Sequence, residues 1–380
     1  MSLLTAVAFV VGVVGLVVGA EWLVRGAARL AARTGLSAIV IGLTVVAFGT
    51  SAPELAVSLG AALGGESDIA LGNVVGSNIA NILLVLGLSA VAGGGLYVAQ
   101  RIVRIDVPIM IAVSAAVLLL GLDGRLGRID GALLTVTLVT YLTWLVVANR
   151  REASSTADED HDDIPDAVEL EEEYSEGLSA GVLRAEPVWR DLLFLVAGLG
   201  LLVVGAQALV GAATDIATSL GVSELVIGLT VVAVGTSLPE IATSVIAAAR
   251  GQRDLAVGNA IGSNLFNIMA VLGISSIITP IGVSDSALGF DLPFMLAVAV
   301  ACLPMFVNGF VLKRWEGAVF LGYYVAYLVW LGLKAAENGF EGTFSLAMLG
   351  FVVPITALTL AVVGWRGWSA WRAGTIVPHA

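Results

Sequence analysis

The sequence predicts an all-α membrane protein that crosses the bilayer many times. The chain has 380 residues, of which 58% are hydrophobic and 13% are charged, and its mean hydropathy is +0.98. Soluble domains carry about 25% charged residues, so this composition excludes an ordinary soluble globular protein. Apolar stretches of 18 or more residues recur along the chain, and each is long enough to cross about 30 Å of hydrocarbon as a helix.

The first apolar stretch, residues 3–19, is expected to remain in the protein as a membrane span. It has no basic segment before it and no clear small-residue cleavage site after it. A basic segment and a small-residue cleavage site are both typical of secretory signal peptides. We therefore interpret this stretch as the first span of the fold.

An internal repeat covers most of the chain. Residues 40–87 align with residues 226–273 at a constant offset of 186 without a gap, and 30 of the 48 aligned positions are identical. The correspondence continues from Asp130 and Tyr141 to Glu316 and Tyr327, and it slips by one residue where Asp106 matches Asp291. Shared apolar composition does not produce such identity, so the chain contains one module of about 150 residues twice.

These boundaries predict four segments. They are a five-helix repeat at residues 1–150, an acidic linker at 151–186, a second five-helix repeat at 187–338, and a tail at 339–380. The tail contains one more apolar stretch, residues 344–364, which is interrupted by Pro354 and is expected to be an extra transmembrane helix.

The acidic linker carries all of the excess negative charge. Twelve acidic residues and no Lys or Arg lie between Glu152 and Glu176, so the remaining 18 acidic residues balance the 18 basic residues of the chain. Such a segment is typical of a solvated loop without a core of its own. A calcium sensor built on this linker is an alternative that its deletion would test.

Basic residues predict the orientation of the spans. Alternate connections, including the one that contains the linker, hold 15 Lys and Arg residues, whereas the opposite connections hold only Arg125, Arg128 and Lys334. By the positive-inside rule, the N-terminus lies outside the cell, and the linker and C-terminus lie in the cytoplasm of a cell-membrane protein.

An odd number of spans per repeat makes the second repeat enter the membrane from the opposite side. Similar sequence in opposite orientation is an inverted-topology repeat, and such folds place their binding site near the bilayer midplane, where the repeats meet.

Two repeat-equivalent glutamates, Glu54 and Glu240, are the strongest candidates for such a site. Each lies within an otherwise apolar span that has no Lys or Arg in its interior to neutralise it. A charged carboxylate in a membrane span is costly and is usually paired. Bound cations or protons are therefore the expected partners.

The residues around each glutamate supply further oxygen ligands. Pro53 and Pro239 precede the two glutamates, and a proline removes a backbone donor from the helix ladder and frees carbonyl oxygens one turn earlier. Carboxylate, carbonyl and hydroxyl oxygens suit a hard cation such as Ca²⁺. The candidate ligands in these motifs, besides the glutamates, are Ala47, Thr50, Ser51, Ala233, Thr236 and Ser237.

A second repeated motif adds a polar stripe. Asn73, Ser77 and Asn81 are four residues apart and share one helix face, as do their equivalents Asn259, Ser263 and Asn267. The alternative interpretation is that these side chains only form hydrogen bonds between packed helices. We expect Ser77, Asn81, Ser263 and Asn267 to complete an oxygen cage, while the stripe's remaining asparagines receive no ligand role.

Other chemistries have little support in the sequence. Cys302 is the only cysteine, and the only histidines are His161 in the linker and His379 beside the C-terminal residue. An intramembrane thiolate or imidazole metal centre is therefore not expected. A hydrolase using Ser51 or Ser237 would have only carboxylates as general bases, so we predict a protein that is not an enzyme and needs no cofactor.

The motifs GTSAPE, GNVVGSN, GTSLPE and GNAIGSN resemble those of the cation/calcium exchanger superfamily, specifically its prokaryotic sodium/calcium exchangers. The resemblance spans roughly residues 1–336. It implies electrogenic exchange of Na⁺ for Ca²⁺ by alternating access, with Glu54 and Glu240 as ligands shared by both ions and the carbonyls of Thr50 and Thr236 joining them on Ca²⁺. It also implies sodium sites shaped by Ala47, Ser51 and Ser263 on one side, and by Ala233, Ser237 and Ser77 on the other.

Two features depart from this family pattern. The positions of Asn81 and Asn267 are often Asp in related exchangers, and the predicted eleventh span exceeds the usual ten. An asparagine keeps a carbonyl oxygen but cannot ionise. The predicted site therefore holds two formal negative charges, which balance one Ca²⁺, while three Na⁺ leave a net charge of +1.

The expected function is a Na⁺/Ca²⁺ antiporter. Its substrates are Ca²⁺ and Na⁺, its environment is the lipid bilayer, and neither nucleic acid nor an obligate protein partner is expected. A Ca²⁺/H⁺ antiporter is the alternative, although Ser51 and Ser237 offer hydroxyl ligands that a proton does not require. A channel fits less well, because a symmetric site closed by carboxylates suits alternating access better than a continuous pore.

Overall fold

The computed structural model describes residues 3–34, 36–156, 187–220, 233–307 and 309–335, together with scattered positions between 346 and 369. The elements of the first half are α1 (Leu3–Thr34), α2 (Ala38–Ile41), η1 (Gly42–Val46), α3 (Ala47–Thr50), α4 (Ala52–Leu63), α5 (Ser67–Ala80), η2 (Asn81–Leu86), α6 (Gly87–Ala92), β1 (Leu96–Tyr97), η3 (Ile102–Asp106), α7 (Val107–Leu120), η4 (Gly121–Asp123), β2 (Arg125–Leu126) and α8 (Arg128–Thr156). Those of the second half are α11 (Val188–Ser219), α13 (Ala233–Gly235), α14 (Leu238–Ala249), α15 (Arg253–Phe266), η6 (Asn267–Leu272), α16 (Gly273–Ile278), β3 (Ile281–Gly282), η7 (Ala287–Asp291), α17 (Leu292–Val307), β4 (Val311–Leu312) and α18 (Arg314–Ala335).

The prediction of a polytopic helical membrane protein is confirmed. The described residues contain eight helices that are long and apolar enough to cross a membrane, or nine if the bent pair Ala38–Thr50 and Ala52–Leu63 forms one span. Linker residues 157–186 and most of the predicted extra span at 344–364 lie outside the described residues. The only strands in the described part are four two-residue segments.

These short strands show how the two repeats are related. β1 pairs antiparallel with β4, and β2 pairs antiparallel with β3. The span Ile102–Asp123 separates β1 from β2, so the two sheets lie at opposite ends of the bundle. The repeat equivalent of β1 is β3, and that of β2 is β4. Equivalent segments therefore lie at opposite ends, as an inverted repeat requires.

Helix crossings obey the same pseudo-symmetry. A Cβ added to Gly131 would come within 2.5 Å of the carbonyl oxygen of Gly273, and one added to Gly317 would come within 2.8 Å of the carbonyl oxygen of Gly87. Gly131 and Gly317 are repeat equivalents, as are Gly87 and Gly273. Small residues let membrane helices approach closely, so α8 packs on α16 as α18 packs on α6.

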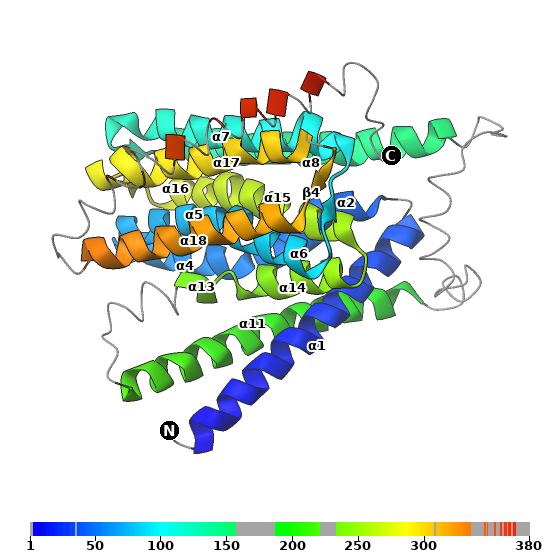
Figure 1. Ribbon diagram of the computed structural model, residues 1–380, viewed down its shortest axis with the longest axis horizontal. Helices are drawn as coiled ribbons and strands as arrows, with labels where there is room; N and C mark the ends of the chain where they lie inside the picture. The colour runs from blue at the N-terminus through cyan, green and yellow to red at the C-terminus, as the bar shows by residue number, and fades with distance from the viewer. Residues whose placement is uncertain are drawn as a thin grey trace.

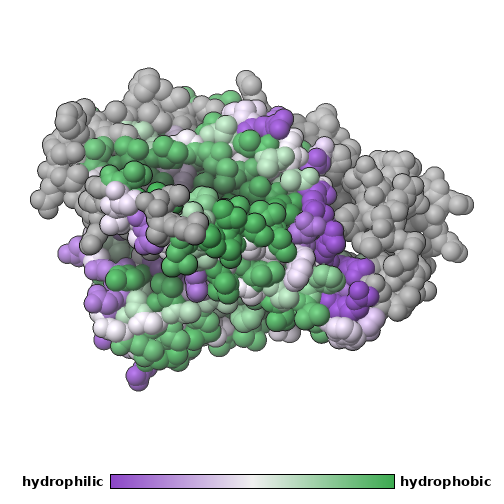
Figure 2. Space-filling view, turned by 90° about the horizontal axis from the view of Figure 1, so that it is seen from below, coloured by the Kyte–Doolittle hydropathy of each residue, from purple (hydrophilic) through white to green (hydrophobic). Residues whose placement is uncertain are grey.

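Helices α1 and α11 form a separate layer along one face of the bundle, where they cross each other diagonally (Figure 1). Their crossing also depends on glycine, because a Cβ on Gly12 or Gly198 would lie within 3 Å of the carbonyl oxygen of Gly205 or Gly19, respectively. Seen from this side, apolar residues cover most of the surface and hydrophilic residues gather toward its ends (Figure 2). This distribution matches a protein whose middle faces lipid.

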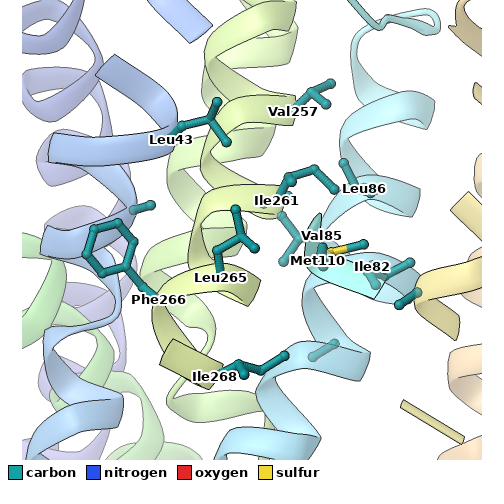
Figure 3. Packing of buried hydrophobic residues seen from close by; sticks show 14 of the residues in the cluster. Leu43, Ile82, Val85, Leu86, Met110, Val257, Ile261, Leu265, Phe266 and Ile268 are labelled. Carbon is teal, nitrogen blue, oxygen red and sulfur yellow. The ribbon is translucent and has the colours of Figure 1, made fainter. Parts of the chain in front are cut away.

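The core of the bundle is built around α15 and its neighbours. Leu43, Ile261 and Leu265 are fully buried; Leu43 of η1 lies on one side of α15, and residues of η2 lie on the other (Figure 3). Within an apolar 18-residue window of each span, 83% is buried in Arg253–Ile278, which contains α15, and 78% in the equivalent Ser67–Ala92, compared with 39% or less in the other long spans. The two central spans are therefore the ones shielded most from lipid.

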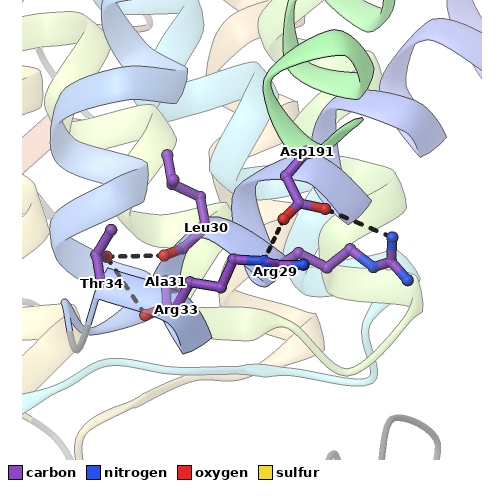
Figure 4. A network of polar contacts seen from close by, with 6 residues as sticks. All are labelled: Arg29, Leu30, Ala31, Arg33, Thr34 and Asp191. Carbon is purple, nitrogen blue, oxygen red and sulfur yellow. Dashed lines mark hydrogen bonds and ion pairs between the residues drawn. The ribbon is translucent and has the colours of Figure 1, made fainter. Parts of the chain in front are cut away.

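One end of the α1–α11 layer is fixed by a buried ion pair. Asp191 at the start of α11 is fully buried and forms ion pairs with Arg29 and Arg33 of α1, whose side chains are only 15% and 14% exposed (Figure 4). Removing one partner of a buried ion pair leaves uncompensated charge behind, which is strongly destabilising.

We expect Asp191→Ala to lower the free energy of unfolding by about 3 kcal/mol, because it leaves the two arginines buried without their carboxylate. The midpoint of thermal unfolding in detergent measures the effect. Asp123→Ala is the control, because Asp123 and its partner Arg125 are both mostly exposed, with side-chain exposures of 63% and 72%. Equal midpoints for the two variants would contradict a stabilising role for the buried pair.

Candidate functional site

The candidate site lies where the helix of each repeat is interrupted. Ser51 ends α3 with φ −81° and ψ 1°, and the equivalent Ser237 has φ −87° and ψ 4°. Both values lie outside the α-helical region, and a proline follows two residues later in each repeat. In the first repeat the two halves of the broken helix meet at an angle of 44°.

Each break leaves backbone oxygens out of the helix ladder. Around the first break the Ser51 N–H donates to the Ala47 carbonyl (3.0 Å) and the Leu55 N–H donates to the Ser51 carbonyl (3.1 Å). Around the second, the Ser237 N–H donates to the Val234 carbonyl (3.2 Å) and the Ile241 N–H to the Ser237 carbonyl (3.0 Å). Pro53 and Pro239 have no N–H to donate to the carbonyls of Gly49 and Gly235, four residues earlier, which lie directly beside Thr50 and Thr236.

Glu54 and Glu240 stand one turn beyond the breaks, and both are completely buried. Their carboxyl groups lie close enough for their charges to interact. Oε1 of Glu54 accepts a hydrogen bond from Ser77 (3.5 Å). Oε2 of Glu54 and both carboxyl oxygens of Glu240 have no hydrogen-bond partner within the described part of the chain.

Hydroxyl groups from both repeats lie next to the Glu54 carboxyl. The Ser237 hydroxyl donates to that of Ser77 (3.5 Å), which in turn donates to Glu54, so residues of the second repeat reach the glutamate of the first. The Thr50 hydroxyl lies 3.3 Å from the Ser263 hydroxyl, which belongs to the other repeat. Ser51 is buried, and its hydroxyl has no partner among the described residues.

Asn81 and Asn267 are buried at equivalent positions where an α-helix changes to a π-helix. They open η2 and η6, and both amide atoms of both side chains lack hydrogen-bond partners within the described residues. Most buried polar side-chain atoms have partners, so such groups need an explanation. Single-turn π-helices also occur frequently at functional sites.

Three of the predicted ligands, Ala47, Thr236 and Ala233, have less structural support than the others. The carbonyl of Ala47 already accepts hydrogen bonds from Ser51 N–H and from the Thr50 hydroxyl (3.4 Å). Thr236 is half-buried, unlike its fully buried equivalent Thr50. Ala233 begins α13, but its side chain is outside the described part of the structure.

Sequence reasoning missed two serines that contact the polar stripe. Asn73 donates to the Ser58 hydroxyl, and Asn259 donates to the Ser244 hydroxyl, both at 2.9 Å. Ser58 and Ser244 lie four residues after the two glutamates and are buried. The sequence did contain a signal for them, because serine occupies this position in both repeats while the residues next to it differ between the repeats.

The Asp106 carboxyl contacts a neighbouring helix and does not cap its own. Asp106 directly precedes α7 but makes no side-chain cap hydrogen bond. Its buried carboxyl instead accepts a hydrogen bond from the Tyr141 hydroxyl (2.8 Å). Asp106 is the last residue of the π-turn η3, and Tyr141 belongs to α8.

The expected oxygen cage would combine the two buried carboxyls of Glu54 and Glu240 with the neighbouring hydroxyl, carbonyl and amide oxygens. The described residues contain no group of three His, Cys, Asp or Glu side chains that could hold a metal ion. Two carboxylates with neutral carbonyl, hydroxyl and amide oxygens can coordinate a hard cation without holding it permanently.

Comparisons with known proteins identify relatives of this arrangement. The model of the sodium/calcium exchanger protein family matches residues 4–147 and 191–333. A putative antiporter, CaxA, of Alkalimonas amylolytica is 40% identical over 284 residues, covering 74% of this chain and 84% of that protein. The sodium/calcium exchanger MaX1 of Methanosarcina acetivorans is 32% identical over 306 residues, covering 74% of this chain and 85% of that protein.

A solved structure shares the fold. The sodium-calcium exchanger NCX_Mj, soaked with Na⁺ and Sr²⁺, superposes with a TM-score of 0.70 at 30% sequence identity. The match covers 87% of this chain and 99% of that chain.

The buried carboxyls lead to a prediction about stability. We expect Glu240→Gln to raise the thermal unfolding midpoint in the absence of divalent cations, because it removes the repulsion between two buried carboxylates. Ca²⁺ at a hundred times its dissociation constant should stabilise the wild type by about 2.7 kcal/mol and leave the variant unchanged. Thermal unfolding with and without Ca²⁺ measures both effects.

Asp106→Asn is the control for this measurement, since it removes a buried carboxyl that is bonded to Tyr141. It should retain the full stabilisation by Ca²⁺. Stabilisation of Glu240→Gln by Ca²⁺ to the wild-type extent would place the cation elsewhere.

Proposed function

The chain belongs to the sodium/calcium exchanger protein family, and from this membership we propose that it is a secondary antiporter that exchanges Na⁺ for Ca²⁺. The observation that carries the proposal is the pair of buried, interacting carboxyls Glu54 and Glu240, three of whose four oxygens have no partner among the described residues. In a membrane span such oxygens need cations or protons.

Charge balance supports Ca²⁺ as one substrate. The two glutamates supply two negative charges, and with Asn at positions 81 and 267 the cage has no further ionisable group. One Ca²⁺ neutralises this charge, and the surrounding oxygens resemble its preferred ligands. We assign Glu54, Glu240, Thr50, Thr236, Asn81 and Asn267 to this ion.

Competition for the same glutamates supports exchange. Na⁺ is also a hard cation, and hydroxyl oxygens beside the carboxyls can complete smaller sites for it. We assign Ala47, Ser51 and Ser263 to one sodium site and Ala233, Ser237 and Ser77 to another. Binding of Na⁺ and binding of Ca²⁺ then exclude each other, because both ions use Glu54 and Glu240.

Access to the site would alternate between the two sides of the membrane. The two repeats meet at the cage and are related by inverted topology, so interchange of their conformations would open the same site to the opposite side. In the proposed orientation the N-terminus is outside and the acidic linker is cytoplasmic. This arrangement uses the sodium gradient to expel calcium from the cell.

The test is uptake of radioactive Ca²⁺ by proteoliposomes that are loaded with Na⁺ and diluted into Na⁺-free buffer at constant pH. We expect uptake to require internal Na⁺ and to fall at least a hundredfold in Glu54→Gln and in Glu240→Gln, because each change removes a shared ligand. Glu66→Gln, at an exposed carboxylate, should transport normally. Uptake driven by a pH gradient and indifferent to Na⁺ would instead establish the Ca²⁺/H⁺ antiporter.

A second prediction follows from the charge count. If three Na⁺ leave for each Ca²⁺ that enters, every cycle moves one positive charge out of the vesicle. An inside-positive potential, set with external K⁺ and valinomycin, should therefore accelerate Ca²⁺ uptake, and an inside-negative potential should slow it. Uptake that does not respond to potential would indicate that two Na⁺ are exchanged for each Ca²⁺.

A further inference from the structure

Asn73 and Asn259 belong to the polar stripes but differ from the other members in their contacts. Both donate their amide N–H groups toward the helices that carry the glutamates. An N–H donor cannot ligate a cation, and its proton carries partial positive charge. The amide oxygen of Asn259 is also engaged, since it accepts a hydrogen bond from the Thr50 hydroxyl (3.2 Å).

In the first repeat these contacts tie one turn of α4 to one turn of α5. Asn73 donates to the Glu54 carbonyl (3.2 Å) and to the Ser58 hydroxyl (2.9 Å), and Ser58 donates to the Ala70 carbonyl (3.1 Å). Helix α4 starts at the break and lacks the stabilisation that a continuous helix would give its first turn. The three bonds therefore fix the backbone of Glu54 relative to α5, which carries Ser77.

In the second repeat the equivalent amide joins three elements. Asn259 of α15 donates to Ser244 of α14, the helix of Glu240, and accepts from Thr50 of α3 in the other repeat. Thr50 lies at the end of the first broken helix, beside the carbonyl that the break releases. Asn259 thus connects the second glutamate's helix with a proposed ligand of the first repeat.

We propose that Asn73 and Asn259 are positioning residues of the cation site, which hold the two glutamate helices in register with the helices that carry the serine and asparagine ligands. They act through Ser58 and Ser244 and do not touch the ion. Asn259 additionally links the repeats through Thr50. This inference rests on the proposed function, because it assumes that the cage binds the transported cation.

The repeat supplies an internal argument for this role. The Asn–Ser hydrogen bond has the same length, 2.9 Å, and uses the same atoms at both repeat positions. Polar residues that only hold helices together by hydrogen bonds would not need the same partner in both repeats. Here both copies bind the position four residues after the glutamate, one turn along the same helix.

The test measures the half-saturating Ca²⁺ concentration for Na⁺-dependent uptake together with Ca²⁺ binding by calorimetry on the purified full chain. We expect Asn259→Ala and Ser244→Ala each to raise both values about tenfold, with little change in maximal uptake rate, because the ligands remain but are misplaced. Combining the two changes should add little, since both break the same bond. Ser244→Thr, which keeps the hydroxyl, should retain tighter binding than Ser244→Ala.

Asn264→Ala is the matched control. Asn264 is buried on the same helix, but its amide donates to the Ala260 carbonyl of that helix (3.2 Å). It should change the half-saturating concentration less than twofold. Asn73→Ala with Ser58→Ala repeats the test in the other half if the Asn259 variants do not fold.

Two outcomes would overturn the inference. Unchanged Ca²⁺ affinity in Asn259→Ala, with thermal stability lowered as in Asn264→Ala, would show that the amide only packs the helices. Fully additive losses for Asn259→Ala and Ser244→Ala would show that each acts alone. Both outcomes require an active wild type, so they are distinct from failure of the proposed function, in which the wild-type protein itself shows no Na⁺-dependent uptake.

Discussion

The burial of two carboxyl groups within one membrane-spanning bundle is the constraint on which the rest of the structure depends. Glu54 and Glu240 are completely shielded from solvent and interact with each other. No basic side chain is paired with either among the described residues. A soluble protein would gain stability by replacing such a pair with apolar residues. Their persistence in both repeats makes sense when mobile cations supply the missing charge.

The backbone around the pair has to provide oxygens while remaining folded inside lipid. Broken helices meet this need, because Pro53 and Pro239 leave the Gly49 and Gly235 carbonyls, beside Thr50 and Thr236, without the N–H four residues later. The break weakens each helix, and neighbouring helices compensate. Glycine crossings such as Gly131 with Gly273 bring the helices close enough for that support. The close packing of neighbouring helices therefore compensates for the helix breaks that free the carbonyls.

Most of the fold could be predicted from the sequence because the information is duplicated. Apolar length predicts spans, and identity at a fixed offset predicts two equivalent modules. The odd number of spans then requires inversion, which the β1–β4 and β2–β3 pairings display. The same duplication selected the glutamates, because a structural accident would not recur at both positions.

The side-chain contacts that the sequence did not predict depend on how each helix is rotated about its axis and how deeply it is buried in the bundle. The π-turns that precede α6, α7, α16 and α17 shift the direction of every following side chain, and no residue type marks them. Asp106, the last residue of one such π-turn, is hydrogen-bonded to Tyr141 of α8. Ser58 and Ser244 were overlooked for a related reason, since a serine in an apolar helix becomes informative only once its neighbouring helix is placed beside it.

The two ends of the α1–α11 layer show where the pseudo-symmetry fails. Arg29 and Asp191 form an ion pair at one end, whereas their repeat equivalents Asp215 and Thr5 form a hydroxyl-to-carboxylate hydrogen bond of 3.4 Å at the other. Perfectly equivalent repeats would give the two access states equal free energy. Charged contacts at one end and a weaker polar contact at the other remove that equality. In the proposed alternating-access cycle, this difference in contacts at the helix ends would favour one access state over the other.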